Sequence, residues 1–339
     1  MNYETLEKLI SEAINYSEGG PCIFSWQGGE PLLAGIEFFK KVIEYQKKYG
    51  KSGQKISNSI QTNGTLINEE WIKLFKEYNF FIGISLDGPR EIHNYYRKDF
   101  RGKGSFNRVM EGLSLLKKDV VEFNILSTIG KETSKYPEKI FNFFLSNQLH
   151  FIQFIPAVDR DIKKKKMADF SVQPDEYGNF LCKIFDMWWN DGNPYVSIRL
   201  FDNILEILLG IETSSCMFKS ECGSYVVVEA NGDVYPCDFF VHKEWKLGNI
   251  WENSFAELFE KVKLKFGKLK RLSPEKCRNC QWNFICNNGC LWFRWVKNGN
   301  LEDIDYFCNC YRRFFSYTIE RFKRLSDSIF FRNILMIRK

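Results

Sequence analysis

Residues 22–31, with the sequence CIFSWQGGEP, join a short apolar run to a glycine-rich turn. The run from Cys22 to Trp26 has the length and composition of a buried β-strand, and the Gly28-Gly29 pair that follows predicts a tight turn. The segments on either side, residues 3–17 and 36–49, have helical periodicity. This stretch therefore predicts a strand between two helices, the unit from which parallel sheets are built.

The same alternation continues through the first half of the chain. Further strands are expected at residues 55–62, 80–86, 121–129 and 151–155. Further helices are expected at residues 68–78, 105–117, 136–147 and 174–190, the first of them capped by Asn68. Strands that alternate with helices in this way predict βαβ units and a parallel sheet.

Polar, glycine-rich motifs follow the ends of four predicted strands. They are Gly-Gly-Glu-Pro, Gln-Thr-Asn-Gly, Ser-Leu-Asp-Gly and Ile-Pro-Ala-Val-Asp. Each motif alone is explained equally well by ordinary turn chemistry. In parallel barrels, however, the carboxyl ends of the strands form the working face, so four such motifs at equivalent positions indicate a site there.

Composition and charge exclude several classes of protein. The chain has 339 residues, is 44% hydrophobic and carries a net charge of +6 that is spread along the sequence, so we do not expect nucleic-acid binding. Residues 2–17 are polar and lack the features of a secretory signal, and no run approaches the roughly 20 apolar residues of a membrane span. We expect a cytoplasmic protein that does not bind membranes.

Eleven cysteines in such a protein favour metal or redox chemistry over disulfides. Nine of them lie between residues 216 and 310, which places a domain boundary near residue 210. The series is Cys216-x5-Cys222-x14-Cys237, then Cys277-x2-Cys280-x5-Cys286-x3-Cys290-x17-Cys308, with Cys310 two residues later. Eight thiolates suit two four-cysteine sites, but this spacing alone fits zinc as well as a [4Fe–4S] cluster.

The remaining cysteines and one carboxylate need separate interpretation. Cys22 and Cys182 lie in apolar patterns and are expected to be core thiols, while Cys310 is expected to be a spare thiol beside the metal sites. Asp238 directly follows Cys237. It is either an ordinary surface carboxylate or a buried general base whose position the neighbouring ligand fixes.

Several of these motifs resemble a known family. Residues 26–31 (WQGGEP) resemble the GGEP motif of radical S-adenosylmethionine (SAM) enzymes, and the Gln-Thr-Asn-Gly and Ser-Leu-Asp-Gly motifs look like their strand-end motifs. The cysteine series resembles the SPASM domain, which carries two auxiliary [4Fe–4S] clusters. More narrowly, residues 92–97 (IHNYYR) and 236–240 (PCDFF) look like anaerobic sulfatase-maturating enzymes, and the resemblance extends from Met1 to about Phe315.

This resemblance implies a fold and a division of the chain. The expected fold is α/β: a partial (β/α)6 radical-SAM barrel that lacks its first strand, followed by a cysteine-rich α+β SPASM domain. The barrel would occupy residues 1–210, the SPASM domain 211–315 and a helical tail 316–339.

The resemblance also implies site residues. Gly29, Ser85, Arg97 and Val158 match positions that contact SAM; a serine and an arginine suit its carboxylate, and a glycine lets backbone approach it. The ligands of the first auxiliary cluster would be Cys216, Cys222, Cys237 and Cys290. Those of the second would be Cys277, Cys280, Cys286 and Cys308. Asp238 matches the catalytic base of the family.

The implied reaction oxidises a Cys or Ser of a sulfatase polypeptide to Cα-formylglycine, with ferredoxin or flavodoxin as electron donor. The family holds its SAM-reducing cluster on a Cys-x3-Cys-x2-Cys loop, and no such triplet occurs in these 339 residues. We therefore expect that a few dozen residues are absent from the front of the chain and that these residues alone do not start the radical reaction.

Three other interpretations stay open at this point. The chain could be a related SPASM maturase that acts on another ribosomal peptide. It could be a non-catalytic protein that retains peptide binding, or a zinc-bound remnant of the enzyme.

Overall fold

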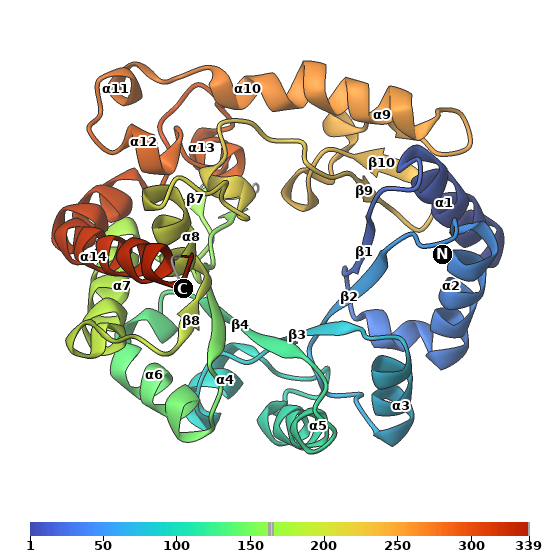
Figure 1. The fold of residues 1–339 in the computed structure, drawn as a ribbon, viewed down its shortest axis with the longest axis horizontal. Coiled ribbons are helices and arrows are strands. Elements are labelled where there is room, and N and C mark those ends of the chain that lie inside the picture. The colour runs from blue at the N-terminus through green and yellow to red at the C-terminus, as the bar shows by residue number, and fades with distance from the viewer. Residues whose placement is uncertain (162–163, 165, 338–339) are drawn as a thin grey trace. The chain divides into compact units, whose positions relative to one another are not determined.

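The computed structural model describes residues 1–161, 164 and 166–337, and its centre is a parallel sheet of six strands. The strand order is β1-β2-β3-β4-β5-β8 (Figure 1). The bounds are β1 Cys22–Trp26, β2 Ile56–Thr62, β3 Phe81–Ser85, β4 Phe123–Ile129, β5 Phe151–Pro156 and β8 Ser197–Ile198. The predicted α/β class with a parallel sheet is confirmed.

Helices alternate with the strands, as the sequence predicted, and helix α1 precedes the first strand. They are α1 Tyr3–Tyr16, α2 Ile36–Tyr49, α3 Glu69–Glu77, α5 Phe106–Lys118, α6 Pro137–Ser146 and α7 Pro174–Trp189. The largest disagreement with the expected bounds is at the start of β4, which begins at residue 123 and not 121. The Asn68 cap is also present, since its side chain accepts hydrogen bonds from the backbone N–H groups of Glu70 and Trp71.

Helices α4 (Arg90–Tyr96) and α8 (Arg199–Leu208) and strand β8 lie outside the elements predicted for the first 210 residues and were not themselves predicted. Helix α4 follows β3, and helix α8 follows β8, whose two residues are too few to give a periodic signal. After β5, the short strands β6 (Arg160–Asp161) and β7 (Lys166–Met167) form an antiparallel pair, and residues 162–163 and 165 lie outside the described residues.

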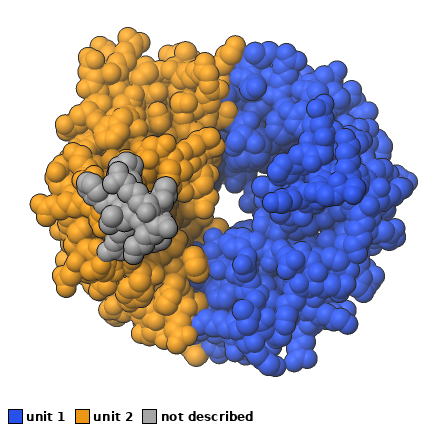
Figure 2. Space-filling view, in the orientation of Figure 1, with its two compact units in different colours: residues 1–86, 93–125, 223–267 blue, residues 87–92, 126–222, 268–339 orange. Residues whose placement is uncertain are grey.

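The chain forms two compact units, which Figure 2 shows in different colours. Unit 1 comprises residues 1–86, 93–125 and 223–267, and unit 2 comprises residues 87–92, 126–222 and 268–337 of the described chain. The cysteine-rich half of the sequence thus contributes to both units. The expected domain ranges 1–210, 211–315 and 316–339 stay a prediction.

In unit 1 the N-terminal helix packs on a small antiparallel sheet from the cysteine-rich half. The sheet consists of β9 (Val227–Val228), β10 (Asp233–Tyr235) and β11 (Gly248–Asn249), followed by helix α9 (Phe255–Lys261). Leu9 of α1 belongs to the same buried cluster as Val234 of β10, and the ring of Tyr16 stacks on that of Phe259 at 4.6 Å. The apolar stripe of α1 is buried here because a helix must cover such a face.

Aromatic side chains fill both cores. In unit 1 the ring of Phe39 contacts those of Trp26, Trp71 and Phe80. In unit 2 helix α14 (Cys308–Ile337) lies beside α7 (Figure 1), and the contacts include a ring pair between Phe185 and Phe322. Among the residues that the structure describes, no helix is both long and apolar enough to cross a membrane.

Candidate functional site

A single carboxylate ties the turn after β1 to the end of β2. Glu30 Oε1 accepts hydrogen bonds from the Thr62 hydroxyl at 2.6 Å and from its own turn at Leu32 N, at 3.1 Å. Its other oxygen accepts one from Asn63 N at 2.8 Å. Charged acceptors make the stronger hydrogen bonds, so Glu30 fixes the Gly-Gly-Glu-Pro and Gln-Thr-Asn-Gly motifs against each other.

The two glycines before Glu30 form an open cradle. Gly28 and Gly29 have φ angles of +96° and +56°, and a Cβ built on either would meet no atom within 4 Å. Backbone in this conformation favours glycine and exposes its peptide groups to a ligand. The geometry at Gly29 fits its expected role beside SAM.

Polar side chains line the neighbouring strands on one face. Ser59 Oγ donates to Ser25 Oγ at 2.9 Å, and Gln61 Nε2 donates to Ser85 Oγ at 3.1 Å. These four side chains come from β1, β2 and β3, whose parallel pairing sets Ser25 beside Ser59 and Gln61 beside Gly83. Ser85 thus lies among polar groups at the carboxyl end of β3, as the sequence predicted for a site at that edge.

Arg97 and Val158 complete the expected SAM set but belong to different units. The backbone of Arg97 is held on both sides, by Arg97 N donating to His93 O at 3.1 Å and by Ser105 N donating to Arg97 O at 3.1 Å. Val158 is buried in unit 2, whereas Gly29, Ser85 and Arg97 belong to unit 1. Their joint contact with SAM stays a prediction.

Asp238 lies in a polar cluster that the small sheet of unit 1 creates. The β9–β10 pairing sets Val227 opposite Tyr235, and continuing this register outward sets Tyr225 opposite Cys237. Tyr225 OH donates to Asp238 Oδ1 at 2.8 Å and lies 3.6 Å from Cys237 Sγ. Gln27 Nε2, from the turn after β1, lies 3.5 Å from Asp238 Oδ2.

The side chain of Asp238 is exposed, so the buried position considered from the sequence is wrong. Strand β10 ends at Tyr235, and the short 3-10 helix Asp238–Phe240 that follows buries Phe240 and leaves the carboxylate outside. An exposed carboxylate can still act as a base on a substrate that covers it.

Four cysteines converge in unit 2. Cys277 and Cys280 bracket the end of α11 (Glu275–Arg278), Cys286 ends α12 (Asn283–Cys286), and Cys308 begins α14. Burial raises the pKa of Cys308 to about 11, and the nearby Cys277 and Cys280 contribute to that increase. Burial likewise raises the pKa of Cys286 to about 12, again with Cys277 and Cys280 as neighbours. The four expected ligands of the second cluster therefore lie together.

Three of the four expected ligands of the first cluster also lie together in unit 2. Burial raises the pKa of Cys290 to about 12, and electrostatic interaction with Cys222 and Cys216 raises it further. The fourth expected ligand, Cys237, belongs to unit 1. Its place in this set stays a prediction.

The three cysteines outside these sets differ in burial. Cys22 and Cys310 are buried, and Cys182 is half-buried on α7. No disulfide joins any of these cysteines in the described part of the chain. The core position expected for Cys22 is confirmed.

The two sets of cysteines stay candidate ligands for iron–sulfur clusters. Within the described residues, no three His, Cys, Asp or Glu side chains are arranged to hold one metal ion. A four-iron cluster holds its cysteines further apart, because iron and sulfide atoms lie between them. Two fully buried cations, Lys270 and Arg294, lie among these thiols and suit an anionic group.

Comparisons with known proteins agree with this geometry. Residues 1–144 match the Radical SAM superfamily, and residues 216–281 match SPASM, an iron–sulfur cluster-binding domain. The chain is 41% identical to the cysteine-type anaerobic sulfatase-maturating enzyme of Clostridium perfringens over 333 residues, which is 97% of this chain and 90% of that one. This chain belongs to the anaerobic sulfatase-maturating enzyme family.

Other relatives in this family include both target types. The serine-type anaerobic sulfatase-maturating enzyme of Bacteroides thetaiotaomicron is 40% identical over 94% of this chain and 80% of its own length. A solved structure titled native anSMEcpe with bound AdoMet and Cp18Cys peptide superimposes with a TM-score of 0.91 and 42% identity over 97% of this chain and 92% of that chain. Streptococcus suis SuiB, at 16% identity and a TM-score of 0.57 over 90% of this chain and 69% of that chain, shares the fold alone.

Sequence reasoning missed the partners of the expected site residues in this maturase-family chain. Gln27 and Tyr225 lie beside Asp238, and Lys270 and Arg294 lie beside the cysteines. Gln27 directly precedes the Gly28-Gly29 pair, and this position could have identified it as a site residue from the sequence. Nothing in the sequence distinguishes Tyr225, Lys270 or Arg294 from surface residues of the same types.

Replacing Glu30 by Ala is expected to lower the free energy of unfolding by about 2–3 kcal/mol, because it removes charged hydrogen bonds and leaves Thr62 and Asn63 N unpaired. Urea denaturation of the purified protein measures this change. Glu37→Ala is the control, since Glu37 makes only an exposed ion pair with Lys40 and should cost less than about 1 kcal/mol. Equal losses in the two variants would contradict the role given to Glu30.

Replacing Cys286 by Ser is expected to remove about half of the protein-bound iron after anaerobic reconstitution, because one of two four-cysteine sites loses a ligand. Iron and sulfide analysis with metal mass spectrometry measures this loss. Cys182→Ser is the matched control and should retain the full iron content. Bound zinc in place of iron, or unchanged iron in the Cys286 variant, would contradict the assignment.

Proposed function

We propose that this chain provides the substrate-, SAM- and auxiliary-cluster-binding parts of a sulfatase maturase, which oxidises a Cys or Ser in a sulfatase polypeptide to Cα-formylglycine by radical-SAM chemistry. The observation that carries this proposal is 41% identity over 97% of the chain to a cysteine-type sulfatase-maturating enzyme. The cluster of Asp238, Tyr225 and Gln27 beside Cys237 supports it, since a carboxylate next to an expected cluster ligand suits coupled removal of a proton and an electron.

The expected cofactors divide among named residues. SAM would be held by Gly29, Ser85, Arg97 and Val158. One auxiliary cluster would be held by Cys216, Cys222, Cys237 and Cys290. The other would be held by Cys277, Cys280, Cys286 and Cys308. When bound, SAM and its reducing cluster would supply a 5′-deoxyadenosyl radical that takes a hydrogen atom from the target Cβ, and the auxiliary clusters would supply acceptors for the electron left behind. Full cysteine ligation leaves these acceptors without an open iron site.

Asp238 would accept the proton of the target thiol or hydroxyl. Tyr225 OH, at 2.8 Å from Oδ1, orients the carboxylate, and Gln27 Nε2 lies on the side of Oδ2. Hydrogen bonds of this kind fix the direction in which a carboxylate presents its free lone pairs. A peptide bound over the exposed side chain would exclude water from the site.

The radical-generating cluster needs ligands that these 339 residues do not contain, because no Cys-x3-Cys-x2-Cys occurs among them. Cys22 is buried and has no cysteine near it in sequence, so it does not replace that loop. We therefore infer that the sequence as printed binds substrate, SAM and auxiliary clusters but starts catalysis only when such a loop is supplied. An electron donor such as ferredoxin or flavodoxin would reduce the supplied cluster.

The test compares two proteins. One is the 339-residue chain, called the printed chain, and the other is the same chain preceded by a segment that carries a Cys-x3-Cys-x2-Cys loop from a sulfatase-maturating enzyme, called the extended chain. Both are assayed anaerobically with SAM, a reductant and sulfatase peptides that carry either Cys or Ser. Formylglycine, detected by mass spectrometry, is expected only with the extended chain. Product from the printed chain would refute the need for the loop, and SAM cleavage without formylglycine would favour a maturase of another peptide.

In the extended chain, Asp238→Asn is expected to lower the rate of formylglycine formation by about 100-fold or more, the usual contribution of a general base. Formation of 5′-deoxyadenosine should persist, because the base acts after hydrogen abstraction. Glu229→Gln is the matched control, since Glu229 is an exposed carboxylate near the same hairpin and should leave the rate unchanged. A smaller effect than fivefold at Asp238 would exclude it as the base.

A further inference from the structure

Unit 2 buries two positive charges among the cysteines. Lys270 of α10 (Lys268–Arg271) and Arg294 of α13 (Leu291–Asn298) each have 0% of their surface exposed. Lysine and arginine are almost never fully buried unless they are paired, because taking a charge out of water costs several kcal/mol.

The hydrogen-bond partners of both cations are neutral carbonyl oxygens. Lys270 Nζ donates to Cys216 O at 2.9 Å and to Met217 O at 2.7 Å. Arg294 donates to the carbonyl oxygens of Asn288, Leu272 and Lys270 at 3.0, 2.9 and 3.1 Å. These bonds satisfy the N–H groups but do not neutralise the charges, and within the described part of the chain neither cation forms a salt bridge.

The nearest buried carboxylate does not compensate them. Asp305 is 5% exposed and uses its oxygens to accept hydrogen bonds from Cys290 N at 2.8 Å and Phe307 N at 2.7 Å. Burial raises the pKa of Asp305 to about 6, although the two cations lower it. Beside these thiols, two buried cations therefore face one buried carboxylate, and positive charge exceeds carboxylate charge there.

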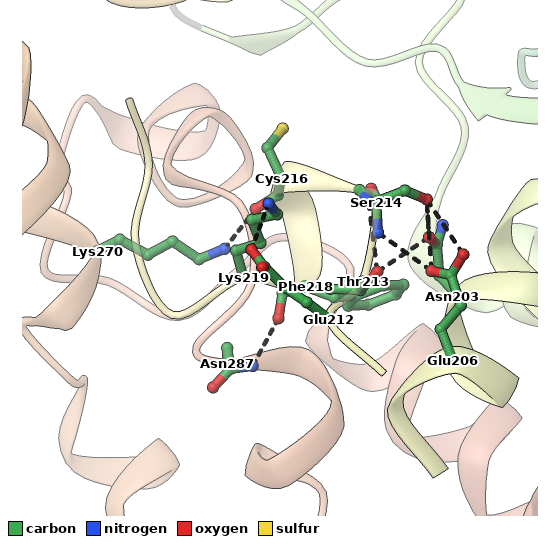
Figure 3. Close-up of polar contacts among 11 residues, drawn as sticks. Asn203, Glu206, Glu212, Thr213, Ser214, Cys216, Phe218, Lys219, Lys270 and Asn287 are labelled. Carbon is green, nitrogen blue, oxygen red and sulfur yellow. Dashed lines mark hydrogen bonds and ion pairs between the residues drawn. The ribbon is translucent and has the colours of Figure 1, made fainter. Parts of the chain in front are cut away.

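The groups that face this charge are the expected cluster ligands. Lys270 interacts electrostatically with Cys222, Cys290 and Cys216, all from the first set of cysteines. Arg294 interacts with Cys277 of the second set as well as with Cys222 and Cys290. Figure 3 shows the amino group of Lys270 at the backbone of the Cys216 segment, from which the thiol extends away.

We propose that Lys270 and Arg294 are the built-in counter-charges of the auxiliary clusters, and that Lys270 selectively raises the reduction potential of the first cluster. This inference rests on the proposed function, since it takes the cysteine sets as cluster ligands. Reduction adds one electron to a cluster that already carries anionic thiolates, and a nearby cation stabilises the added charge. The strongest thiol interactions of Lys270 are all with the first set, whereas those of Arg294 are with both sets. The electron removed from the peptide would therefore be drawn to the first cluster.

Three variants separate the effect of the Lys270 charge from the effect of its hydrogen bonds. Lys270→Met removes both the charge and the hydrogen bonds to Cys216 O and Met217 O, Lys270→Gln removes the charge and keeps a donor, and Lys270→Arg keeps both. Lys183→Met is the control, since Lys183 is an exposed lysine of the same unit. Each protein is reconstituted anaerobically, its iron is counted, and the potentials of its clusters are measured by redox titration followed by electron paramagnetic resonance.

In the Met and Gln variants, the reduction equilibrium constant of one cluster is expected to shift at least tenfold toward the oxidised form. This is a potential change of about 59 mV for one electron. The equilibrium constant of the other cluster should change less than threefold. The Arg and Lys183 variants should leave both within threefold. If the neutral variants fail to retain the first cluster while Lys270→Arg retains it, the counter-charge is needed for binding, which supports the proposal.

Unchanged potentials in a fully loaded Met or Gln variant would overturn the proposal, as would loss of iron in Lys270→Arg, which would make Lys270 a packing element. Equal shifts in both clusters would overturn the selective role of Lys270. Failure of the proposed function looks different, because the unsubstituted protein would then lack two cluster signals or bind zinc.

Discussion

The parallel pairing of β1 with β2 and of β2 with β3 is the constraint on which the SAM side of the site depends. Parallel strands end at the same edge of the sheet, so the pairing alone brings the residues that follow them close together. Glu30 then converts this proximity into fixed geometry, since its two oxygens join the turn after β1 to Thr62 and Asn63. The glycine cradle at Gly28 and Gly29 is held open by that connection.

Strand register also sets the surroundings of Asp238, here in the small antiparallel sheet of unit 1. The antiparallel register of β9 and β10 brings Tyr225 across from Cys237, and the next residue is the carboxylate itself. The proposed proton acceptor and an expected cluster ligand thus occupy consecutive positions. Packing of α1 on this sheet joins the first residues of the chain to the cysteine-rich half, because the apolar face of α1 is buried by Val234 and its neighbours.

Burial has opposite effects on the two kinds of ionisable group in unit 2. It raises the pKa of the thiols at Cys286, Cys290 and Cys308, which disfavours free thiolates, and it isolates the cations Lys270 and Arg294 from water. The proposed clusters would remove both penalties, since metal binding deprotonates thiols and would supply negative charge beside the cations.

Much of this protein was determined by local sequence. The helices and strands of the first half follow periodicity and turn residues, as the Asn68 cap and the bounds of α2 illustrate. The cysteine series predicted two four-cysteine sites, and the assignment of each cysteine to one of them is what the family resemblance implies. Tertiary structure alone decided the exposure of Asp238, the contacts of Tyr225 and Gln27 with it, and the burial of Lys270 and Arg294. These contacts and this burial bring together residues that are far apart in the sequence, such as Gln27 and Asp238. A long-range contact or a buried charge leaves no periodic pattern in the local sequence, so sequence reasoning cannot find it.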